Sequence, residues 1–294
     1  MEGFFQSKKW KDARNGALLQ CVEAATLGMP LEVWKTRMGR YRNETTIEAF
    51  ANVYKRAGGG FSGVRAFWAG TSAKMVESAS KGAVLMFSKE MIKDSALAMG
   101  MGPGTAGFLA GAGGGVCQVT VMGPCTFLVT SVVNGQKGVS LSSHVTNTWR
   151  SKGLLGFYPG GVAIAWRQAT NWASRQGFTD FARTMIAKHL HGNPTTKLSV
   201  REEVAAGIIG GVLSSWNHPF EVARIEAQSR AAAGEQKLGM LAILKQVHHE
   251  HGVAGLFKGV IPRIGLGVWQ TLFMVTGANL IREHILKEAP KVGH

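Results

Sequence analysis

Cysteine is scarce in this chain, with three residues among 294. Cys21, Cys117 and Cys125 lie in apolar surroundings and lack the CxxC or Cys/His spacing of a metal site. This excludes a disulfide framework and a cysteine-ligated zinc site, so we expect the three thiols to be packing residues. The histidines in 248–251 leave a metal site open, but a polar surface helix is the favoured setting, and no metal is expected.

Motifs of enzymes are missing as well. The chain has no GxxxxGK[ST] phosphate loop, no nucleophile elbow and no pair of catalytic carboxylates. We therefore expect neither enzymatic activity nor a cofactor. The basic N-terminal segment 1–14 lacks the apolar stretch and small-residue cleavage site of a secretory signal, so any targeting signal should be internal or uncleaved.

Acidic residues are few relative to basic ones, 18 against 33, which gives a net charge of +15. Such a charge predicts anionic partners, whether nucleic acid, acidic lipid headgroups or a negatively charged solute. The mean hydropathy of +0.04 leaves both a soluble and a membrane protein open, because polar groups around an internal aqueous path lower the hydropathy of a helical bundle.

An internal repeat organises the chain. Pro30, Pro124 and Pro219 each end a Gly- and Ala-rich apolar stretch, and they stand 94 and 95 residues apart. The segments that begin at these prolines read PLEVWK, PCTFLV and PFEVAR, so two of the three fit P-x-E-x-x-[KR]. We call these segments the signature segments.

Further features recur in register downstream. An aromatic-x-Gly turn ends at Gly70, Gly160 and Gly259, which lie 40, 36 and 40 residues past the prolines. Twenty residues after each glycine, and again three residues later, stand polar side chains: Glu90 and Lys93, Asp180 and Arg183, and Asn279 and Arg282. A coincidence over three repeats is excluded by this register, which indicates a triplicated unit.

The repeats predict an all-α fold in which each unit is a long helix, a short surface helix and a second long helix. No alternating strand pattern competes. We expect long helices near 15–38, 71–96, 104–134, 161–186, 202–230 and 260–286, and surface helices over 46–56, 140–150 and 238–251, ending near Gly58, Gly153 and Gly252. The repeats are assigned to residues 15–103, 104–200 and 201–294.

These features resemble the mitochondrial carrier family, and the resemblance covers nearly the whole chain. It implies six transmembrane helices in the mitochondrial inner membrane, short helices on the matrix side, function as a monomer, and antiport by alternating access. Three longer strings, in 214–229, 167–175 and 262–275, resemble the fungal members that carry citrate and 2-oxoglutarate, so tricarboxylates and dicarboxylates are the expected substrates.

Counting from the three glycines gives equivalent positions on one face of the second long helix of each repeat. This face carries Lys74, Lys81, Arg167, Arg175 and Arg263 against Glu77, and ionisable groups at the bilayer centre imply a shared aqueous cavity. Arginine binds carboxylates through two parallel hydrogen bonds. The expected substrate-binding residues are Glu77, Lys81, Leu85, Arg167, Gln168, Asn171, Arg263 and Gln270.

Structural roles remain open for some of these charges. Glu77 and Lys81 have the i, i+4 spacing of an ion pair within a helix. Glu23, on the first helix, is favoured as a neutralising partner for a cavity cation. Thr26, Thr120 and Ser215 occupy equivalent places before the prolines, where hydrogen bonds back to their own helix are the favoured explanation.

Two gates follow from the resemblance. The matrix gate comprises Glu32, Lys35, Glu221 and Arg224, and the cytosolic gate comprises Glu90, Lys93, Asp180, Arg183, Asn279 and Arg282. Because the second signature segment supplies Thr126 and Val129 instead of charges, only Glu221 with Lys35 is expected to pair on the matrix side. Two pairs on the cytosolic side would then favour a matrix-open resting state.

The remaining expectations concern partners. The turns at Gly70, Gly160 and Gly259 precede helix N-termini, which favour anions, so we expect them to bind lipid phosphates, including those of cardiolipin. Non-specific association with DNA is an alternative suggested by the charge, although the basic residues are scattered and no DNA-binding motif is present. A carrier for a different anionic metabolite is a second alternative. A purely structural membrane protein is a third, against which the internal cationic face argues.

Overall fold

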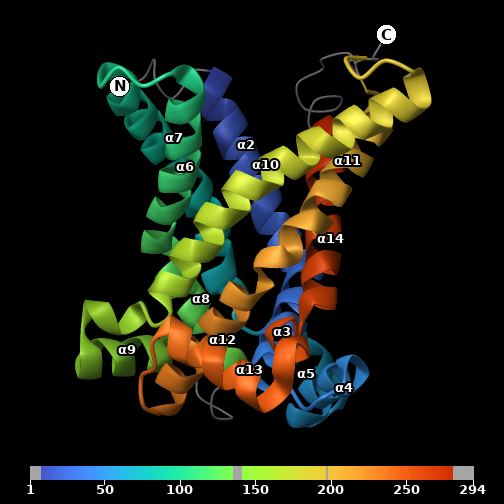
Figure 1. Cartoon of the computed structure of the whole chain (residues 1–294). Coiled ribbons are helices and arrows are strands. Elements are labelled where there is room, and N and C mark those ends of the chain that lie inside the picture. The colour runs from blue at the N-terminus through green and yellow to red at the C-terminus, as the bar shows by residue number, and fades with distance from the viewer. Residues whose placement is uncertain (1–7, 135–140, 197, 281–294) are drawn as a thin grey trace.

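The computed structural model describes residues 8–134, 141–196 and 198–280. Within these residues the chain is helical without strands, which confirms the all-α prediction. Six long helical segments run side by side, and short helices collect at one end of the bundle, at the bottom of Figure 1. We call this the signature end, because the signature segments lie there.

Each repeat has the predicted order of elements. The first comprises α2 (Lys8–Glu23), η1 (Ala24–Gly28), α3 (Met29–Arg40), α4 (Thr46–Arg56), α5 (Gly60–Arg65), η2 (Ala66–Trp68) and α6 (Thr71–Ala98). The second comprises α7 (Pro103–Cys117), α8 (Val119–Asn134), α9 (Leu141–Lys152), η3 (Leu154–Phe157) and α10 (Gly161–His191). The third comprises α11 (Val200–Leu213), η4 (Ser214–Asn217), α12 (His218–Ala233), α13 (Met240–Leu256) and α14 (Val260–Leu280).

The first long helix of each repeat is broken, where the sequence predicts a continuous helix. Proline lacks a backbone N–H and its ring clashes with the carbonyl four residues earlier, which kinks a helix at that point. The residues four before the three prolines are Thr26, Thr120 and Ser215, and Thr26 has non-helical dihedral angles (φ −93°, ψ −122°). All three hydroxyls donate to carbonyls of their own helix, at 2.8, 2.8 and 3.4 Å, as predicted.

Side chains from the aromatic-x-Gly turns reach these kinks in two repeats. Trp68 Nε1 donates to the carbonyl of Ala25 at 2.7 Å, and the Tyr158 hydroxyl donates to the carbonyl of Thr120 at 2.8 Å. A carbonyl released from its helix by proline thereby regains a donor. Phe257, at the third equivalent position, has no such donor.

The three turn glycines close the repeats into a ring. Gly160 has φ +72°, and a Cβ there would lie 3.2 Å from the carbonyl oxygen of Arg224 in the third repeat. Gly70 likewise abuts Val129 of the second repeat, and Gly259 abuts Lys35 of the first. Because every repeat meets the next through a glycine, the three units enclose a common axis.

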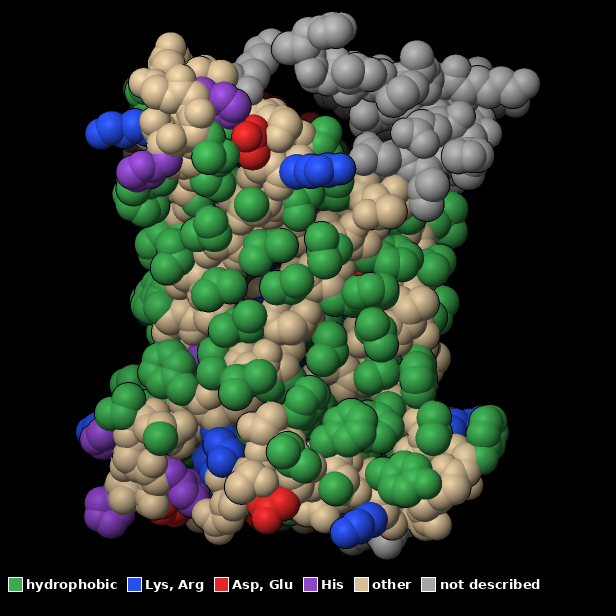
Figure 2. All heavy atoms as spheres, turned by 90° about the vertical axis from the view of Figure 1, so that its right-hand side faces the viewer, with side chains coloured by type: hydrophobic (Ala, Val, Ile, Leu, Met, Phe, Trp, Pro, Cys, Tyr) green, Lys and Arg blue, Asp and Glu red, His purple; other side chains and the backbone are tan. Residues whose placement is uncertain are grey.

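The outer surface of the bundle is apolar at mid-height. Figure 2 shows hydrophobic side chains over the middle of one face and charged and histidine side chains near its ends. Exposed apolar residues on the long helices include Phe87, Phe108, Trp166, Phe181, Ile209 and Leu272. Such a wide exposed apolar surface fits a lipid environment.

Among the described residues, one helical segment, Pro103–Asn134, has both the length and the apolar composition to cross a membrane by itself. Several other long segments carry charged side chains toward the bundle interior, which lowers their mean hydropathy. Because of these polar inward-facing side chains, the composition of these helices alone does not identify them as membrane-spanning.

The surface helices lie close to their predicted bounds. α4 covers the predicted residues 46–56, and Gly58 follows it with φ +94°. Gly153 (φ +60°) follows α9, whereas α13 continues past Gly252 after a kink (φ +64°). His248 and His249 are exposed on α13.

Candidate functional site

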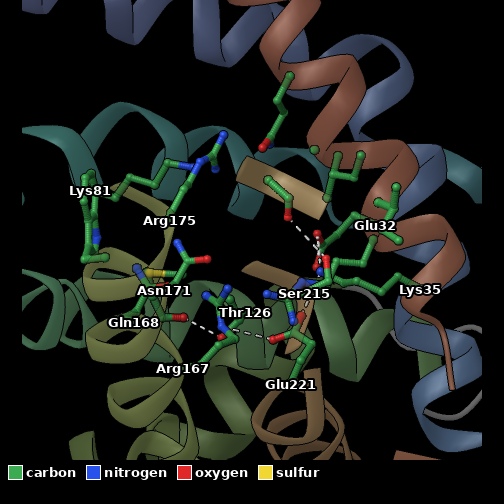
Figure 3. A pocket seen from close by; sticks show the side chains of 18 of the residues that line it. Glu32, Lys35, Lys81, Thr126, Arg167, Gln168, Asn171, Arg175, Ser215 and Glu221 are labelled. Carbon is green, nitrogen blue, oxygen red and sulfur yellow. Dashed lines mark hydrogen bonds and ion pairs between the residues drawn. The ribbon is translucent and has the colours of Figure 1, made fainter. Parts of the chain in front are cut away.

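A polar cavity of about 230 Å³ lies on the common axis of the bundle. Its walls come from all three repeats, through α3, α6, α8, α10, α11, α12 and α14. Figure 3 shows Lys81 and Arg175 on one side of it and Glu32 and Lys35 on the other. This space suits a small metabolite and excludes a macromolecule.

The signature end of the cavity is closed by ion pairs. Lys35 Nζ lies 2.8 Å from both Glu32 Oε2 and Glu221 Oε1, and Arg224 Nη2 lies 2.8 Å from Glu221 Oε1. Arg224 Nη2 also lies 3.8 Å from Glu32 Oε1, a contact that the sequence analysis missed. The structure thus brings together Glu32, Lys35, Glu221 and Arg224, all of them buried.

A glutamine connects the second repeat to this cluster. Gln228 Nε2 donates to Thr126 Oγ1 at 2.9 Å, while its Oε1 accepts from Arg224 Nη1 at 2.7 Å and from Thr130 Oγ1 at 2.9 Å. Val129, which replaces the expected base, packs in an apolar cluster with Val33. Neutral hydrogen bonds and packing therefore stand in for the charges that the second signature segment lacks.

A second layer of ion pairs lies between α3 and α12. Glu226 pairs with Arg40, with Arg42 at 2.7 Å and with Arg230 at 2.8 Å. The second repeat has no equivalent among the described residues. Asn134 donates to Ser229 Oγ at 3.0 Å and to the carbonyl of Thr36 at 3.2 Å. The ion pairs between repeats at this end are concentrated at the seam of the first and third repeats.

The pairing of Glu77 with Lys81, which the sequence left open as a structural alternative, is not formed between these two described residues. Glu77 Oε2 lies 3.1 Å from Lys74 Nζ, three residues earlier, and Lys74 also lies 3.9 Å from Glu32. Lys81 is left without an ion-pair partner among the described residues, although it lines the cavity. Lys74 thus lies between a carboxylate of its own helix and Glu32 of α3.

Seven of the eight predicted binding residues line the cavity: Glu77, Lys81, Arg167, Gln168, Asn171, Arg263 and Gln270. Leu85 does not, and its side chain instead approaches Gly114 of α7. Arg175 stands at the equivalent position of α10 and does line the cavity, so the difference lies in the side chain, since the apolar leucine packs against α7. Its inclusion in the cavity is therefore corrected.

Several cavity groups are already engaged. Arg167 Nε lies 3.2 Å from Glu221 Oε2, and Gln168 Nε2 donates to Gln118 Oε1 at 2.6 Å. Gln270 Nε2 donates to Glu23 Oε2 over a long 3.4 Å, while Glu23 Oε1 is buried without a partner. Glu23 forms no direct ion pair with a described residue, but Lys74 and Lys81 lie close enough to interact with it electrostatically, and its role as a neutralising partner of a cavity cation stays a prediction.

Three cavity cations have no carboxylate partner among the described residues. Lys81 comes from α6, Arg175 from α10 and Arg263 from α14, so each repeat supplies one. Arg263 contacts neutral groups, donating to Asn217 Oδ1 and, at 3.3 Å, to His218 Nδ1. The cavity is therefore electropositive and can bind an anion with several negative charges.

At the other end of the bundle, the ion pairs that join two repeats through described residues lie on one side only, between α10 of the second repeat and α11 of the third. There α6 and α7 diverge from α10 and α11 (Figure 1), and Glu90 and Lys93 are exposed and form no ion pair that the described part of the chain shows. Arg183 pairs with Asp180 of its own helix at 2.9 Å and with Glu203 of α11 at 2.8 Å. The Asn279 side chain and Arg282 lie outside the described part.

The conformation is thus opposite to the expected one, with the signature end closed and the other end open. The expected state was inferred only from the charges of the signature segments. The contacts of Gln228 and Glu226 and the contact between Arg224 and Glu32 were not included. Of these, Gln228 carried a usable signal, since it stands four residues after Arg224 and shares its helical face. Asn217 and Gln118 carried none, because nothing in the repeat register marks them.

Comparison with known proteins supplies the family context. The sequence model of the family described as "Mitochondrial carrier protein" matches residues 6–99, 102–190 and 196–289. The chain is 35% identical to the citrate/oxoglutarate carrier protein of Saccharomyces cerevisiae, over 95% of this chain and 92% of the relative.

Two further relatives are more distant. The chain is 27% identical to mitochondrial citrate transporter B of Aspergillus niger, over 88% of this chain and 87% of the relative. It is 24% identical to the mitochondrial 2-oxodicarboxylate carrier of Mus musculus, over 80% and 81%. The names of all three relatives refer to carboxylates.

Proposed function

We propose, since this chain belongs to the mitochondrial carrier family, that it exchanges citrate for 2-oxoglutarate across the mitochondrial inner membrane. One observation carries the proposal: each repeat contributes one cavity cation without a carboxylate partner among the described residues, namely Lys81, Arg175 and Arg263. Three such charges around one axis complement a tricarboxylate, and two of them suffice for a dicarboxylate. All three belong to one chain, so a monomer suffices.

Arg167 supplies the link between binding and gating. Its Nε lies 3.2 Å from Glu221 Oε2, while Glu221 also holds Lys35 and Arg224 in the closed matrix gate. A substrate carboxylate that binds the Arg167 guanidinium competes with Glu221 for it. Binding thereby weakens the gate from the cavity side, and Gln168 and Asn171 lie beside Arg167 to contact a hydroxyl or keto oxygen.

The direct test is exchange in liposomes that contain the purified protein. Labelled citrate outside should enter only when unlabelled citrate or 2-oxoglutarate is inside, and ADP inside should not support uptake. Equal uptake with ADP or with empty liposomes would contradict the proposal. Gel filtration with detergent-corrected light scattering would check the monomer.

We further propose that anionic lipid phosphates bind at the three aromatic-x-Gly turns. Gly70 and Gly160 are the left-handed N-caps of α6 and α10, and Gly259 immediately precedes α14. The first N–H groups of a helix lack partners within the helix and attract anions. Cardiolipin should therefore raise the melting temperature more than phosphatidylcholine does, and an equal effect of both lipids would refute this.

A further inference from the structure

Asn217 and His218 are polar where the other repeats are not. They occupy the two positions before Pro219, whereas Gly28 with Met29, and Met122 with Gly123, precede the other prolines. Both polar side chains are 0% exposed. A buried amide or imidazole is costly unless its hydrogen bonds are made, so their contacts indicate what these residues do.

Asn217 joins two helices of the cavity. Its Nδ2 donates to the backbone carbonyl of Arg167 and to Thr170 Oγ1, each at 3.2 Å, and both acceptors are on α10. Its Oδ1 accepts from Arg263 Nη2 on α14. A single buried amide thus fixes the Arg263 guanidinium relative to the helix segment that carries Arg167.

His218 holds the same guanidinium from a second direction. A guanidinium can only donate, so His218 Nδ1 accepts from Arg263 Nη1 at 3.3 Å. The hydrogen of the ring must then be on Nε2, which donates to the carbonyl of Lys258 at 2.9 Å. The ring also stacks on Phe257, with centroids 6.4 Å apart, so the third aromatic-x-Gly turn holds the imidazole in place.

These partners orient Arg263 without neutralising it. Arg167 shares Glu221 with the gate, and Lys74 is paired with Glu77. Arg263, by contrast, contacts an amide oxygen and an imidazole nitrogen, neither of which carries a negative charge. Its charge remains available to an anion in the cavity while its side chain loses rotational freedom in advance of binding.

We propose that Asn217 and His218 are positioning residues that set the geometry of Arg263 relative to Arg167 and thereby determine the affinity for polycarboxylates. The inference rests on the proposed function. It assigns to the third repeat a preorganised anion-binding arginine that the first two repeats lack.

The test measures citrate exchange in liposomes for Asn217→Ala. Loss of the amide frees the guanidinium, so KM for citrate should rise roughly tenfold with little change in the maximal rate. Ser214→Ala is the matched control, because Ser214 is equally buried in η4 but its hydroxyl bonds only to Gly210 of the same turn, at 2.6 Å. If Asn217→Ala does not insert, Asn217→Ser serves instead.

A double-mutant cycle separates positioning from general stability. In an Arg263→Lys background, Asn217→Ala should leave KM for citrate unchanged, since the group it positions is gone. His218→Gln, which retains a hydrogen-bonding side chain, should lie closer to the unmodified protein than His218→Leu. The melting temperature of every variant is measured in parallel.

The outcomes distinguish the two proposals. If Arg263→Lys alone leaves citrate uptake normal, the proposed binding site is wrong. If Arg263→Lys reduces uptake but Asn217→Ala multiplies KM equally in both backgrounds, or lowers only the maximal rate as a loss of folded protein would, the positioning role is overturned and the proposed function stands.

Discussion

Single residues differ in how much of their charge is free for an anion. Arg167 shares its guanidinium with Glu221, whereas Arg263 contacts only neutral partners, although both side chains line the same cavity. Equivalent positions in the other repeats do not repeat either arrangement, since Lys74 occupies the place of Arg263 and pairs with Glu77. The asymmetry fits an asymmetric ligand.

Replacing either arginine by lysine tests this difference. Lysine keeps the charge but cannot form two parallel hydrogen bonds with a carboxylate, so Arg167→Lys and Arg263→Lys should each lower initial citrate uptake about tenfold or more. Arg150→Lys is the control, because Arg150 is exposed on α9. Normal uptake in both variants, with unchanged melting temperatures, would return these arginines to a structural role.

Helical register predicted most of the cavity lining but not its pairing. Counting from the turn glycines correctly predicted seven cavity-lining side chains, because α6, α10 and α14 are continuous helices. The partner of Glu77 could not be obtained in this way, because the choice between Lys74 and Lys81 depends on Glu32 of another helix. Contacts such as those of Asn217 likewise depend on the packing of distant segments.

At the scale of elements, the proline kinks depend on donors from neighbouring turns. The sequence located the prolines and the turns, but it did not show that Trp68 and Tyr158 reach carbonyls at the kinks. The sequence also predicted continuous helices, because the position of a proline alone does not determine whether a helix bends or breaks.

Tyr158→Phe removes the donor to the carbonyl of Thr120 and should lower the free energy of unfolding by about 1 kcal/mol. Thermal unfolding in detergent measures this. Tyr41→Phe is the control, because the Tyr41 ring contacts Arg37 through its face, which the substitution preserves. If both variants lose the same stability, the Tyr158 hydroxyl contributes nothing specific at the kink.

At the scale of the whole molecule, the three repeats are joined unevenly at the signature end. Several ion pairs join the first and third repeats, whereas the second repeat is joined to the third by the single described pair of Arg167 with Glu221 and otherwise by neutral hydrogen bonds. The three-fold register of the sequence correctly predicted the fold but misjudged the gate, because Glu226 and Gln228 lie outside the signature segments.

Glu226→Gln should shift the protein toward the matrix-open state roughly tenfold, about 1.4 kcal/mol, since Glu226 is buried between Arg40 and Arg42. Glu235→Gln is the control, because Glu235 is 39% exposed and such pairs contribute about 0–1 kcal/mol. Side-specific labelling of Asn171→Cys, in a background without Cys21, Cys117 and Cys125, reports the state. Equal labelling in both variants would assign no gating role to Glu226.

The three cavity cations that lack an ion-pair partner among the described residues also bear on the step in which the empty protein changes sides. While one end is open, water solvates Lys81, Arg175 and Arg263. Passage through an occluded intermediate would strip that water away, and an uncompensated buried charge costs several kcal/mol. A bound polycarboxylate cancels this self-energy, so the loaded protein reorients much faster than the empty one. We therefore expect net movement of one metabolite to require the return of another, and electrostatics to contribute to this coupling.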